Sequence, residues 1–222
     1  MWMDCWALEI PFKYWFQSPE GCNSDSNRKR ALFRCFPIQR SVVVLSNSND
    51  VTKEVFENKC LDNKIEVLRR KGGGGTVLLG PGTVVLTLAF NAKDLFQNSR
   101  YFSLINSMWA ESIKKYTGLQ LIENGYSDLT YKEKKIVGTS LFRSKNFLLY
   151  QGSLLVDADY NLMNATLKHP SREPSYRKGR THSDFLTTLK NEGYEGTPEE
   201  LSAFCQTWFH QNFFSIMDNH FY

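Results

Sequence analysis

The sequence has few cysteines, and none has the spacing of a disulfide framework or a zinc site. Five occur in 222 residues, at positions 5, 22, 35, 60 and 205. The count is odd, no C-x-x-C pair occurs, and the N-terminus has neither the basic nor the apolar region of a secretory signal. These absences predict reduced thiols and a cytoplasmic protein.

Long apolar runs and a strong excess of one charge are also absent. No stretch approaches the roughly 20 apolar residues that cross a bilayer, so we expect no membrane association. The net charge is only +4, whereas dedicated nucleic-acid binders concentrate far more positive charge. Two short basic clusters, at 28–30 and 177–180, give weak support for DNA binding, and we expect no nucleic-acid partner.

The composition is that of a chain that folds. Hydrophobic residues make up 41% and charged residues 23% of the sequence, a balance that excludes a wholly disordered protein. The length suits one large domain, and neither a repeat nor a linker divides the chain. We therefore predict a single domain over residues 1–222.

The order of the expected elements indicates a mixed α+β fold, with a largely antiparallel sheet flanked by helices. Short stretches rich in β-branched and apolar residues are bounded by turn residues, such as Gly80-Pro81-Gly82. The predicted strands cover residues 41–45, 65–70, 76–79, 83–90, 119–123, 128–132, 135–142 and 147–156.

The first predicted helix follows Asp50, an N-cap candidate. Spacing by four residues places Val51, Val55 and Lys59 on one face of this helix. A later helix is predicted at 160–167, directly after two aspartates that are candidates for its N-terminal cap.

The longest predicted helix covers 99–117 and ends at Gly118. The last helix begins at the capping box Thr197-Pro198-Glu199-Glu200, which has proline at the first helical position. Two polar segments, 21–30 and 168–182, are predicted to be exposed loops, the second of them mobile.

Four consecutive glycines, Gly72–Gly75, begin two residues after Arg70, the last residue of a predicted strand. Ordering a glycine costs ~0.5–1 kcal/mol more than ordering an alanine, yet apolar strands on both sides indicate that this loop is held in the fold. Backbone without side chains lets a ligand approach several N–H groups, and Arg70 adds a planar fork for phosphate or carboxylate oxygens. The alternative is a flexible hairpin with solvated cations.

A second unusual passage is KKIVGTS, from Lys134 to Ser140. Glycine inside a strand often marks the close approach of a ligand, and a lysine beside it would neutralise a phosphate or a developing oxyanion. A solvated strand end is the alternative. The four histidines lie outside these passages, so a serine or cysteine triad is hard to assemble.

These passages recur, in the same order, in a known family. RRKGGGGTV, SDL, KKIVGTS and QGSLLVDAD resemble motifs of the lipoate-protein ligases and their octanoyltransferase relatives, over roughly residues 42–189. The resemblance implies the α+β fold of the biotin/lipoate ligase catalytic domain. It also implies that ATP and Mg²⁺ activate lipoate or octanoate as an acyl-adenylate. The acyl group then passes to a lysine of a lipoyl carrier domain, in a 2-oxoacid dehydrogenase or the glycine cleavage H protein.

The resemblance also implies roles for individual residues. Lys135 matches the catalytic lysine that holds the carbonyl and phosphate oxygens of the activated acyl group. Arg70 matches an arginine that contacts the acyl-adenylate, and Asp128 matches an acid near the nucleotide or its magnesium. The other implied substrate- or nucleotide-binding residues are Gly73, Gly74, Gly75, Thr76, Val77, Gly138, Thr139, Ser140 and Gly152.

Four positions depart from the family's motifs and remove polar groups from the implied pocket. Gly72 replaces a serine, Leu79 a histidine, Ser127 an asparagine and Gln151 a histidine. The departures spare Arg70 and Lys135, but they support an alternative in which the chain binds an acyl group or a carrier domain without catalysis.

The second alternative is an octanoyltransferase, which carries the acyl group on a cysteine. The loop that usually holds this cysteine corresponds to 167–180, which has none, so the ligase is favoured, although Cys205 could fold back toward the site. Only about 30 residues follow the matching region, too few for the accessory C-terminal domain of many ligases. The resemblance therefore implies a separate small subunit or pre-activated acyl groups.

Overall fold

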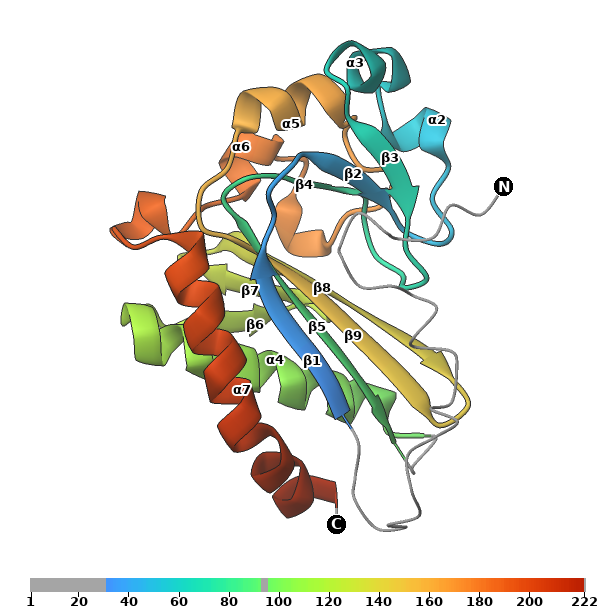
Figure 1. The fold of residues 1–222 in the computed structure, drawn as a ribbon. Coiled ribbons are helices and arrows are strands. Elements are labelled where there is room, and N and C mark those ends of the chain that lie inside the picture. Colours follow the sequence, from blue (N-terminus) through green and yellow to red (C-terminus); the bar gives the residue numbers. More distant parts are fainter. Residues whose placement is uncertain (1–30, 93–95, 222) are drawn as a thin grey trace.

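The structure is a computed structural model that describes residues 31–92 and 96–221. Its larger layer is a six-stranded antiparallel sheet (Figure 1). The predicted loop at 21–30 lies outside the described residues. The strands, in their order across the sheet, are β1 (Ala31–Pro37), β5 (Thr83–Asn91), β9 (Phe147–Leu155), β8 (Lys134–Ser144), β7 (Asp128–Tyr131) and β6 (Ile122–Asn124).

A second, three-stranded sheet lies at the top of the view in Figure 1. Its central strand is β2 (Val42–Leu45), which pairs in parallel with β3 (Glu66–Arg69) and antiparallel with β4 (Val77–Leu79). Every predicted strand has a counterpart, with ends shifted by one or two residues except at 119–123, where β6 begins three residues later. The strand β1 has no counterpart among the predictions. The fold is therefore the predicted mixed α+β arrangement.

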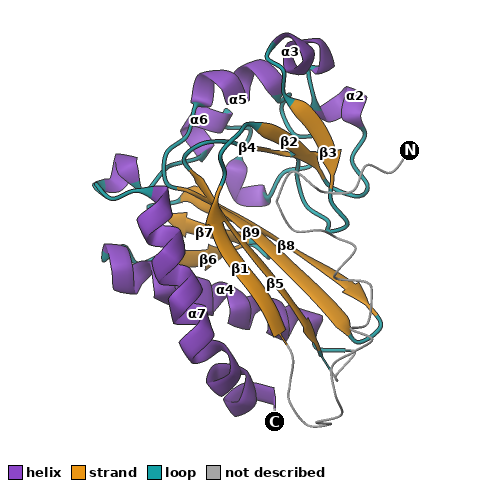
Figure 2. Cartoon of the chain, viewed as in Figure 1, coloured by secondary structure: helices purple, strands orange, loops and turns teal. Residues whose placement is uncertain are grey.

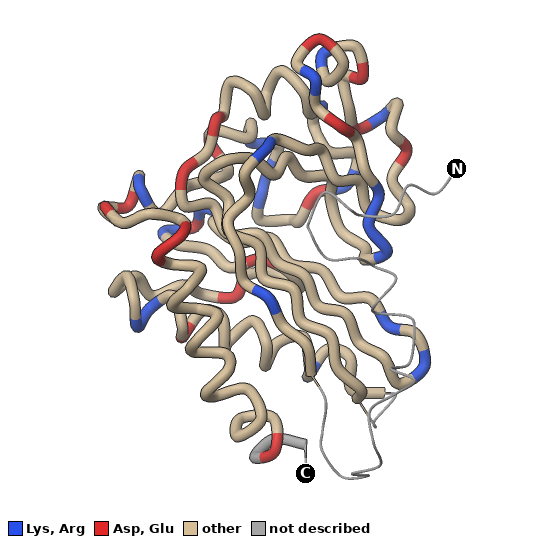
Figure 3. The backbone as a smooth tube through the Cα atoms, viewed as in Figure 1, with Lys and Arg blue, Asp and Glu red and all other residues tan. Residues whose placement is uncertain are grey.

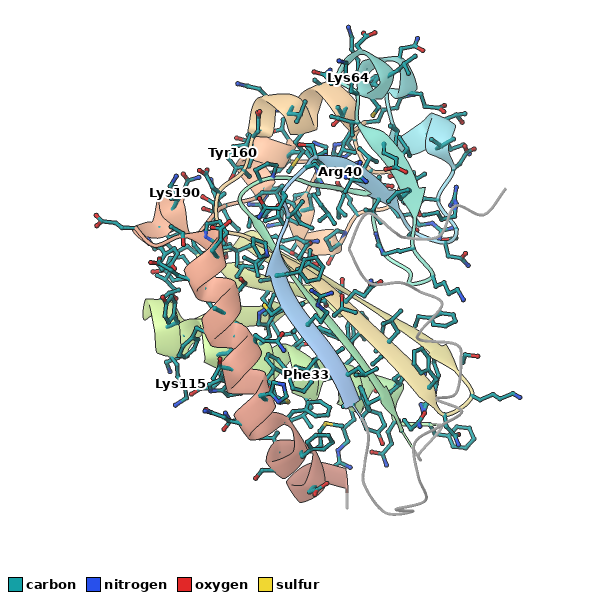
Figure 4. The ribbon with its side chains drawn as sticks, in the orientation of Figure 1. Phe33, Arg40, Lys64, Lys115, Tyr160 and Lys190 are labelled. Atoms are coloured by element: carbon teal, nitrogen blue, oxygen red, sulfur yellow. The ribbon has the colours of Figure 1, made fainter. Side chains whose placement is uncertain are left out.

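Two long helices, α4 (Asn98–Thr117) and α7 (Pro198–Phe221), lie along the larger sheet (Figures 1 and 2). Phe33 of β1 points toward α7 (Figure 4), where its ring centroid lies 4.6 Å from that of His210. Short helices surround the smaller sheet, and two short 3₁₀ helices lie between α5 and α7. These elements are α2 (Val51–Glu54), α3 (Glu57–Asp62), α5 (Tyr160–Thr166), η2 (Ser175–Arg177), α6 (His182–Phe185) and η3 (Lys190–Glu192).

The valine run of β2 is buried on both faces of the smaller sheet. Val43 packs with Cys60 of α3 and Met163 of α5. Val44 packs in a different cluster with Val85 of the larger sheet. Because apolar partners cover both sides, an uninterrupted apolar run rather than an alternating one forms this strand.

Charged residues are distributed unevenly over the fold. In Figure 3 the middle of the larger sheet is almost free of charge, whereas charged residues gather on loops and around the smaller sheet. β5 is buried from Thr83 to Phe90. Within the described ranges, no helix is long and apolar enough to cross a membrane. Charged groups that could contact a ligand therefore come from strand ends and connecting segments.

The predicted helix with Val51, Val55 and Lys59 on one face is wrong. The chain forms α2 and α3 instead, and Val55 between them is extended, with φ −131° and ψ 142°. Val55 forms a β-bridge with Leu167, the residue directly after α5. Pairing with a segment far along the chain thus overrides the local helical pattern.

The predicted helix ends are confirmed. The side chain of Asp50 accepts a hydrogen bond from the N–H of Thr52 (3.0 Å). Gly118 ends α4 in the left-handed region, with φ 76°. In the capping box of α7, the N–H of Thr197 donates to Oε2 of Glu200 (2.9 Å), and the N–H of Glu200 donates to Oγ1 of Thr197 (3.2 Å).

Gly152 allows α4 to pack directly on β9. A Cβ atom at Gly152 would lie 2.1 Å from Cζ3 of Trp109, whose side chain is fully buried. The indole therefore rests on the strand backbone itself. The glycine that the family resemblance assigns to ligand binding also has this packing role.

We expect Gly152→Ala to lower the free energy of unfolding by about 1–3 kcal/mol, because the added methyl group overlaps Trp109 in a filled core. Denaturant unfolding measures the change. Gly73→Ala is the matched control, since a Cβ there would have no neighbour within 4 Å and its φ is not positive. Equal unfolding free energies for the two variants would contradict the packing role.

Candidate functional site

A cavity of about 690 Å³ is lined by residues of both sheets and of the segment after α5. Ligand pockets usually have volumes of ~300–1,000 Å³. Much of the wall is apolar, which suits a hydrocarbon chain. The apolar lining residues are Val44, Val77, Leu78, Leu79, Val85, Ile136, Leu155, Met163, Leu167, Phe185 and Leu186.

A cation and an anion are paired in the cavity wall, where β7 and β8 begin. The Nζ atom of Lys135 is 2.7 Å from Oδ1 of Asp128, and the two side chains are 24% and 5% exposed. Gly138 leaves room for this lysine, since a Cβ atom there would lie 2.9 Å from both Cε and Nζ of Lys135. A side chain at position 138 would therefore displace the ammonium group.

Tyr176 binds the other oxygen of the same carboxylate. Its hydroxyl donates to Oδ2 of Asp128 (2.6 Å), and the hydroxyl of Ser127 donates to Oδ1 (3.3 Å). Burial raises the pKa of Tyr176, and the negative charge of Asp128 raises this pKa further, so the phenol keeps its proton. The carboxylate is thus fixed by three neighbours, and it fixes the position of the Lys135 ammonium in turn.

The segment 168–182 lies largely at the surface, as predicted, but it also forms part of the cavity wall and is attached to the fold by specific contacts. The hydroxyl and the N–H of Ser171 both donate to Oε1 of Glu54, a buried residue of α2. Arg177 is only 5% exposed, and its guanidinium lies 4.8 Å from the ring centroid of Phe185. These contacts hold the polar, proline-containing segment against the fold.

Arg70 shapes the glycine loop. Its Nη2 atom donates to the carbonyl oxygens of Gly73 (2.7 Å) and Gly75 (2.8 Å), and its Nη1 atom donates to that of Val44 (3.3 Å). Gly74 has a φ of 99°, in the left-handed region that side chains disfavour. The guanidinium therefore closes the loop into a turn at the cavity.

The structure brings together nearly all of the residues that the sequence singles out. Gly73 is the exception, because it contacts Arg70 without lining the cavity. Sequence reasoning missed three residues of the cavity wall, Glu54, Tyr176 and His182. The only signal for Tyr176 and His182 is that a tyrosine and a histidine occur in a basic segment, and Glu54 has no such signal. The predicted residues that line the cavity are Arg70, Gly74, Gly75, Thr76, Val77, Asp128, Lys135, Gly138, Thr139, Ser140 and Gly152.

The described residues include no group of three or more His, Cys, Asp or Glu side chains that could hold a metal ion. Both oxygens of Asp128 already interact with protein groups, Lys135 and Tyr176. A magnesium role for Asp128 stays a prediction.

His182 also lines the cavity, at the start of α6. Burial lowers the pKa of His182 to about 4, and the positive charges of Arg177 and His169 contribute to the lowering. The imidazole is therefore neutral at neutral pH and adds no cation to the site.

We expect acid to destabilise the protein partly through His182. The imidazole of an unfolded chain has a pKa of ~6.5, and that of His182 is about 4 in the fold, so the unfolded state takes up a proton first. This contribution to stability is present above ~pH 6.5 and is lost as the pH falls toward 4. Urea unfolding should show a smaller loss for His182→Gln between neutral pH and about pH 4.5. Identical losses in the variant and the wild type would contradict the expectation.

Comparison with known proteins relates the whole arrangement to one family. A family model of the lipoyl protein ligase A/B catalytic domain matches residues 22–210. The chain is 24% identical over 189 residues to a Plasmodium falciparum protein named "Inactive lipoate--protein ligase 2". That match covers 70% of this chain and 49% of the relative, so the chain spans about half the relative's length.

Two solved structures share the fold. One describes a bi-partite lipoate protein ligase and its E2 lipoyl domain from Thermoplasma acidophilum, with a TM-score of 0.72 and 20% identity over 84% of this chain and 72% of that one. The other is lipoate-protein ligase A bound with ATP, with a TM-score of 0.70 and 20% identity over 84% of this chain and 74% of that one. Identities this low establish likeness of fold alone.

Proposed function

Since the chain belongs to the lipoyl protein ligase A/B catalytic domain family, we propose that it transfers a lipoyl or octanoyl group to a lysine of a lipoyl carrier domain. The donor is an acyl-adenylate, formed from lipoate or octanoate and ATP. The carrier belongs to a 2-oxoacid dehydrogenase or is the glycine cleavage H protein. One observation carries the proposal: the ammonium of Lys135 is fixed in the wall of a largely apolar cavity, beside a glycine loop.

The transfer step needs a cation but no nucleophile from the enzyme. The ε-amine of the carrier lysine attacks the acyl carbon, an amide bond forms, and the bond from that carbon to the phosphate oxygen breaks. AMP leaves, and the attacking nitrogen gives up a proton. A fixed cation stabilises the negative charge that develops on the carbonyl and phosphate oxygens. Lys135 supplies this charge, and Asp128 and Tyr176 position it.

The relatives support the other participants. Lipoate-protein ligase A with bound ATP supports ATP as the activating substrate, with Mg²⁺ accompanying its phosphates. The Thermoplasma acidophilum ligase and its E2 lipoyl domain support a lipoyl domain as the acceptor. That ligase is described as bi-partite, which supports a separate small subunit that assists adenylate formation.

A second function, binding of an acyl group or a carrier domain without catalysis, has support of its own. The Plasmodium falciparum relative is named inactive. In this chain Leu79 stands where the family has a histidine, and it is buried in an apolar cluster with Val42 and Val44. This part of the cavity wall therefore lacks an imidazole that could act on a ligand.

Separate measurements of activation and transfer distinguish these functions. Activation is followed as pyrophosphate release from ATP with Mg²⁺ and lipoate. Transfer is followed by mass spectrometry of an apo lipoyl domain mixed with synthetic lipoyl-adenylate and the protein. Both reactions together identify a ligase, and transfer alone identifies an enzyme that uses pre-activated acyl groups or needs a separate subunit for activation. Binding of lipoyl-adenylate without either reaction supports the non-catalytic function and contradicts our proposal.

We expect the loss of Lys135 to lower the rate of transfer from lipoyl-adenylate about 10²–10³-fold, the usual effect of removing one group that stabilises an oxyanion. Lys135→Met alone also leaves the buried Asp128 without its cation, which can disturb folding. The double variant Lys135→Met/Asp128→Asn avoids that problem, because the amide carries no charge. Transfer rates and melting temperatures of both variants are measured together.

Lys134→Met is the control for charge, since Lys134 is the adjacent residue of β8 and does not line the cavity. It should transfer the acyl group at nearly the wild-type rate. If the Lys135 variants are folded and also keep the wild-type rate, Lys135 is not the group that stabilises the transition state.

The octanoyltransferase alternative requires a cysteine at the cavity. Cys35, Cys60 and Cys205 are the cysteines in the described part of the chain, and all three are buried and do not line the cavity. Cys205 lies in the core, with its Sγ atom 3.6 Å from Oγ of Ser112 in α4. That position is on the helix-covered side of the sheet.

We therefore expect Cys205→Ala to keep acyl transfer near the wild-type rate, because the thiol cannot reach the bound acyl group. Intact-mass spectrometry of the wild-type protein after incubation with lipoyl-adenylate should show no acyl adduct on this residue. An adduct that disappears in a folded Cys205→Ala protein, together with loss of transfer, would establish a thioester route instead.

A further inference from the structure

Position 72 is a glycine, whereas the motif that the chain resembles has a serine there. The side chain of Ser140 occupies the adjoining space. A Cβ atom built at Gly72 would lie 2.9 Å from Oγ and 3.1 Å from Cβ of Ser140. A side chain at position 72 and the hydroxyl at position 140 therefore compete for one volume.

Ser140 lines the cavity, and its hydroxyl is available to a ligand. The residue is 7% exposed, and within the described residues its Oγ atom takes part in no hydrogen bond. This oxygen is not among the buried polar atoms that lack a partner, so solvent can reach it. An oxygen of a bound ligand can replace such a water as its hydrogen-bond partner.

Ser140 and Lys135 act on the same region of the cavity. Alternation along β8 puts positions 138 and 140 on one side of the strand, and the ammonium of Lys135 lies against Gly138. Positions two apart in a strand are separated by roughly 7 Å. A ligand group with several oxygens, such as an acyl phosphate, can therefore contact both side chains at once.

We propose that the Ser140 hydroxyl donates a hydrogen bond to an oxygen of the bound acyl-phosphate group, and that Gly72 makes room for this hydroxyl. The resembled motif has a serine hydroxyl at position 72, whereas in this chain the hydroxyl of Ser140 occupies the space beside Gly72. Ser140 is thus a ligand-binding residue coupled to Gly72. This inference rests on the proposed function, because it takes the acyl-adenylate as the ligand.

The test exchanges the two side chains. Calorimetry measures the binding of lipoyl-sulfamoyl-adenosine, a stable acyl-adenylate mimic, to the wild type, Ser140→Ala, Gly72→Ser and the double variant. We expect Ser140→Ala to weaken binding about tenfold without lowering the melting temperature of the free protein. Gly72→Ser should also weaken binding, because its side chain displaces the Ser140 hydroxyl. The double variant should recover most of the wild-type affinity, since one hydroxyl again occupies the shared volume.

Ser144→Ala is the matched control, because Ser144 is an exposed residue at the end of β8 that does not line the cavity. It should bind the mimic as the wild type does. Wild-type affinity in Ser140→Ala would overturn the role of Ser140 alone. A double variant as weak as Ser140→Ala would overturn the coupling with Gly72. If the wild type itself does not bind the mimic, the proposed function fails, and this inference fails with it.

Discussion

The buried carboxylate of Asp128 is the constraint on which the cavity depends. An ionised group whose side chain is only 5% exposed must be paired and hydrogen-bonded, since removing a charge from water is costly. Its neighbours come from separate segments: Lys135 from the next strand and Tyr176 from a segment 48 residues later. Lys135 can reach Asp128 only because Gly138 has no side chain. One buried charge thus links strand pairing, a glycine in a strand and the docking of segment 168–182.

The same pair of strands supports both the core and the site. On β9, Gly152 lets the Trp109 ring of α4 lie directly on the backbone, and on the neighbouring β8, Gly138 lets the Lys135 side chain do the same. Each glycine occurs where another residue's side chain needs the space above a strand, which is the usual meaning of glycine in a strand interior. Trp109 of α4 packs on β9, and β8 is paired with β9 along most of its length. The ammonium is therefore positioned by a rigid element and not by a loop, as a preorganised site requires.

The strands could be predicted from the sequence because they depend on local patterns, and the family resemblance of the ordered motifs implied a part of the cavity lining. Apolar runs indicate β2 and β5, and the ordered motifs point to Arg70, Asp128 and Lys135. The break at Val55 and the docking of 168–182 could not be predicted, because both result from contacts between distant segments. Val55 pairs with Leu167, and Ser171 binds Glu54 across 117 residues of chain. A polar segment with two prolines has the composition of an exposed loop, and no local signal reveals that a buried carboxylate in α2 accepts its hydrogen bonds.

The balance of charge in the cavity bears on which step of the chemistry it suits. Several of its cations are already engaged: Arg70 binds loop carbonyls, Lys135 is paired with Asp128, and Arg177 lies 3.5 Å from Glu173. The charged lining residues are Arg70, Lys135, Lys168, Arg172 and Arg177 with Glu54, Asp128 and Glu173. In the proposed function, this small surplus among the described lining residues suits the single negative charge of an acyl-adenylate, whereas the triphosphate of ATP carries more negative charge than these side chains balance. We therefore infer that transfer from the adenylate, rather than activation, is the step that these side chains serve.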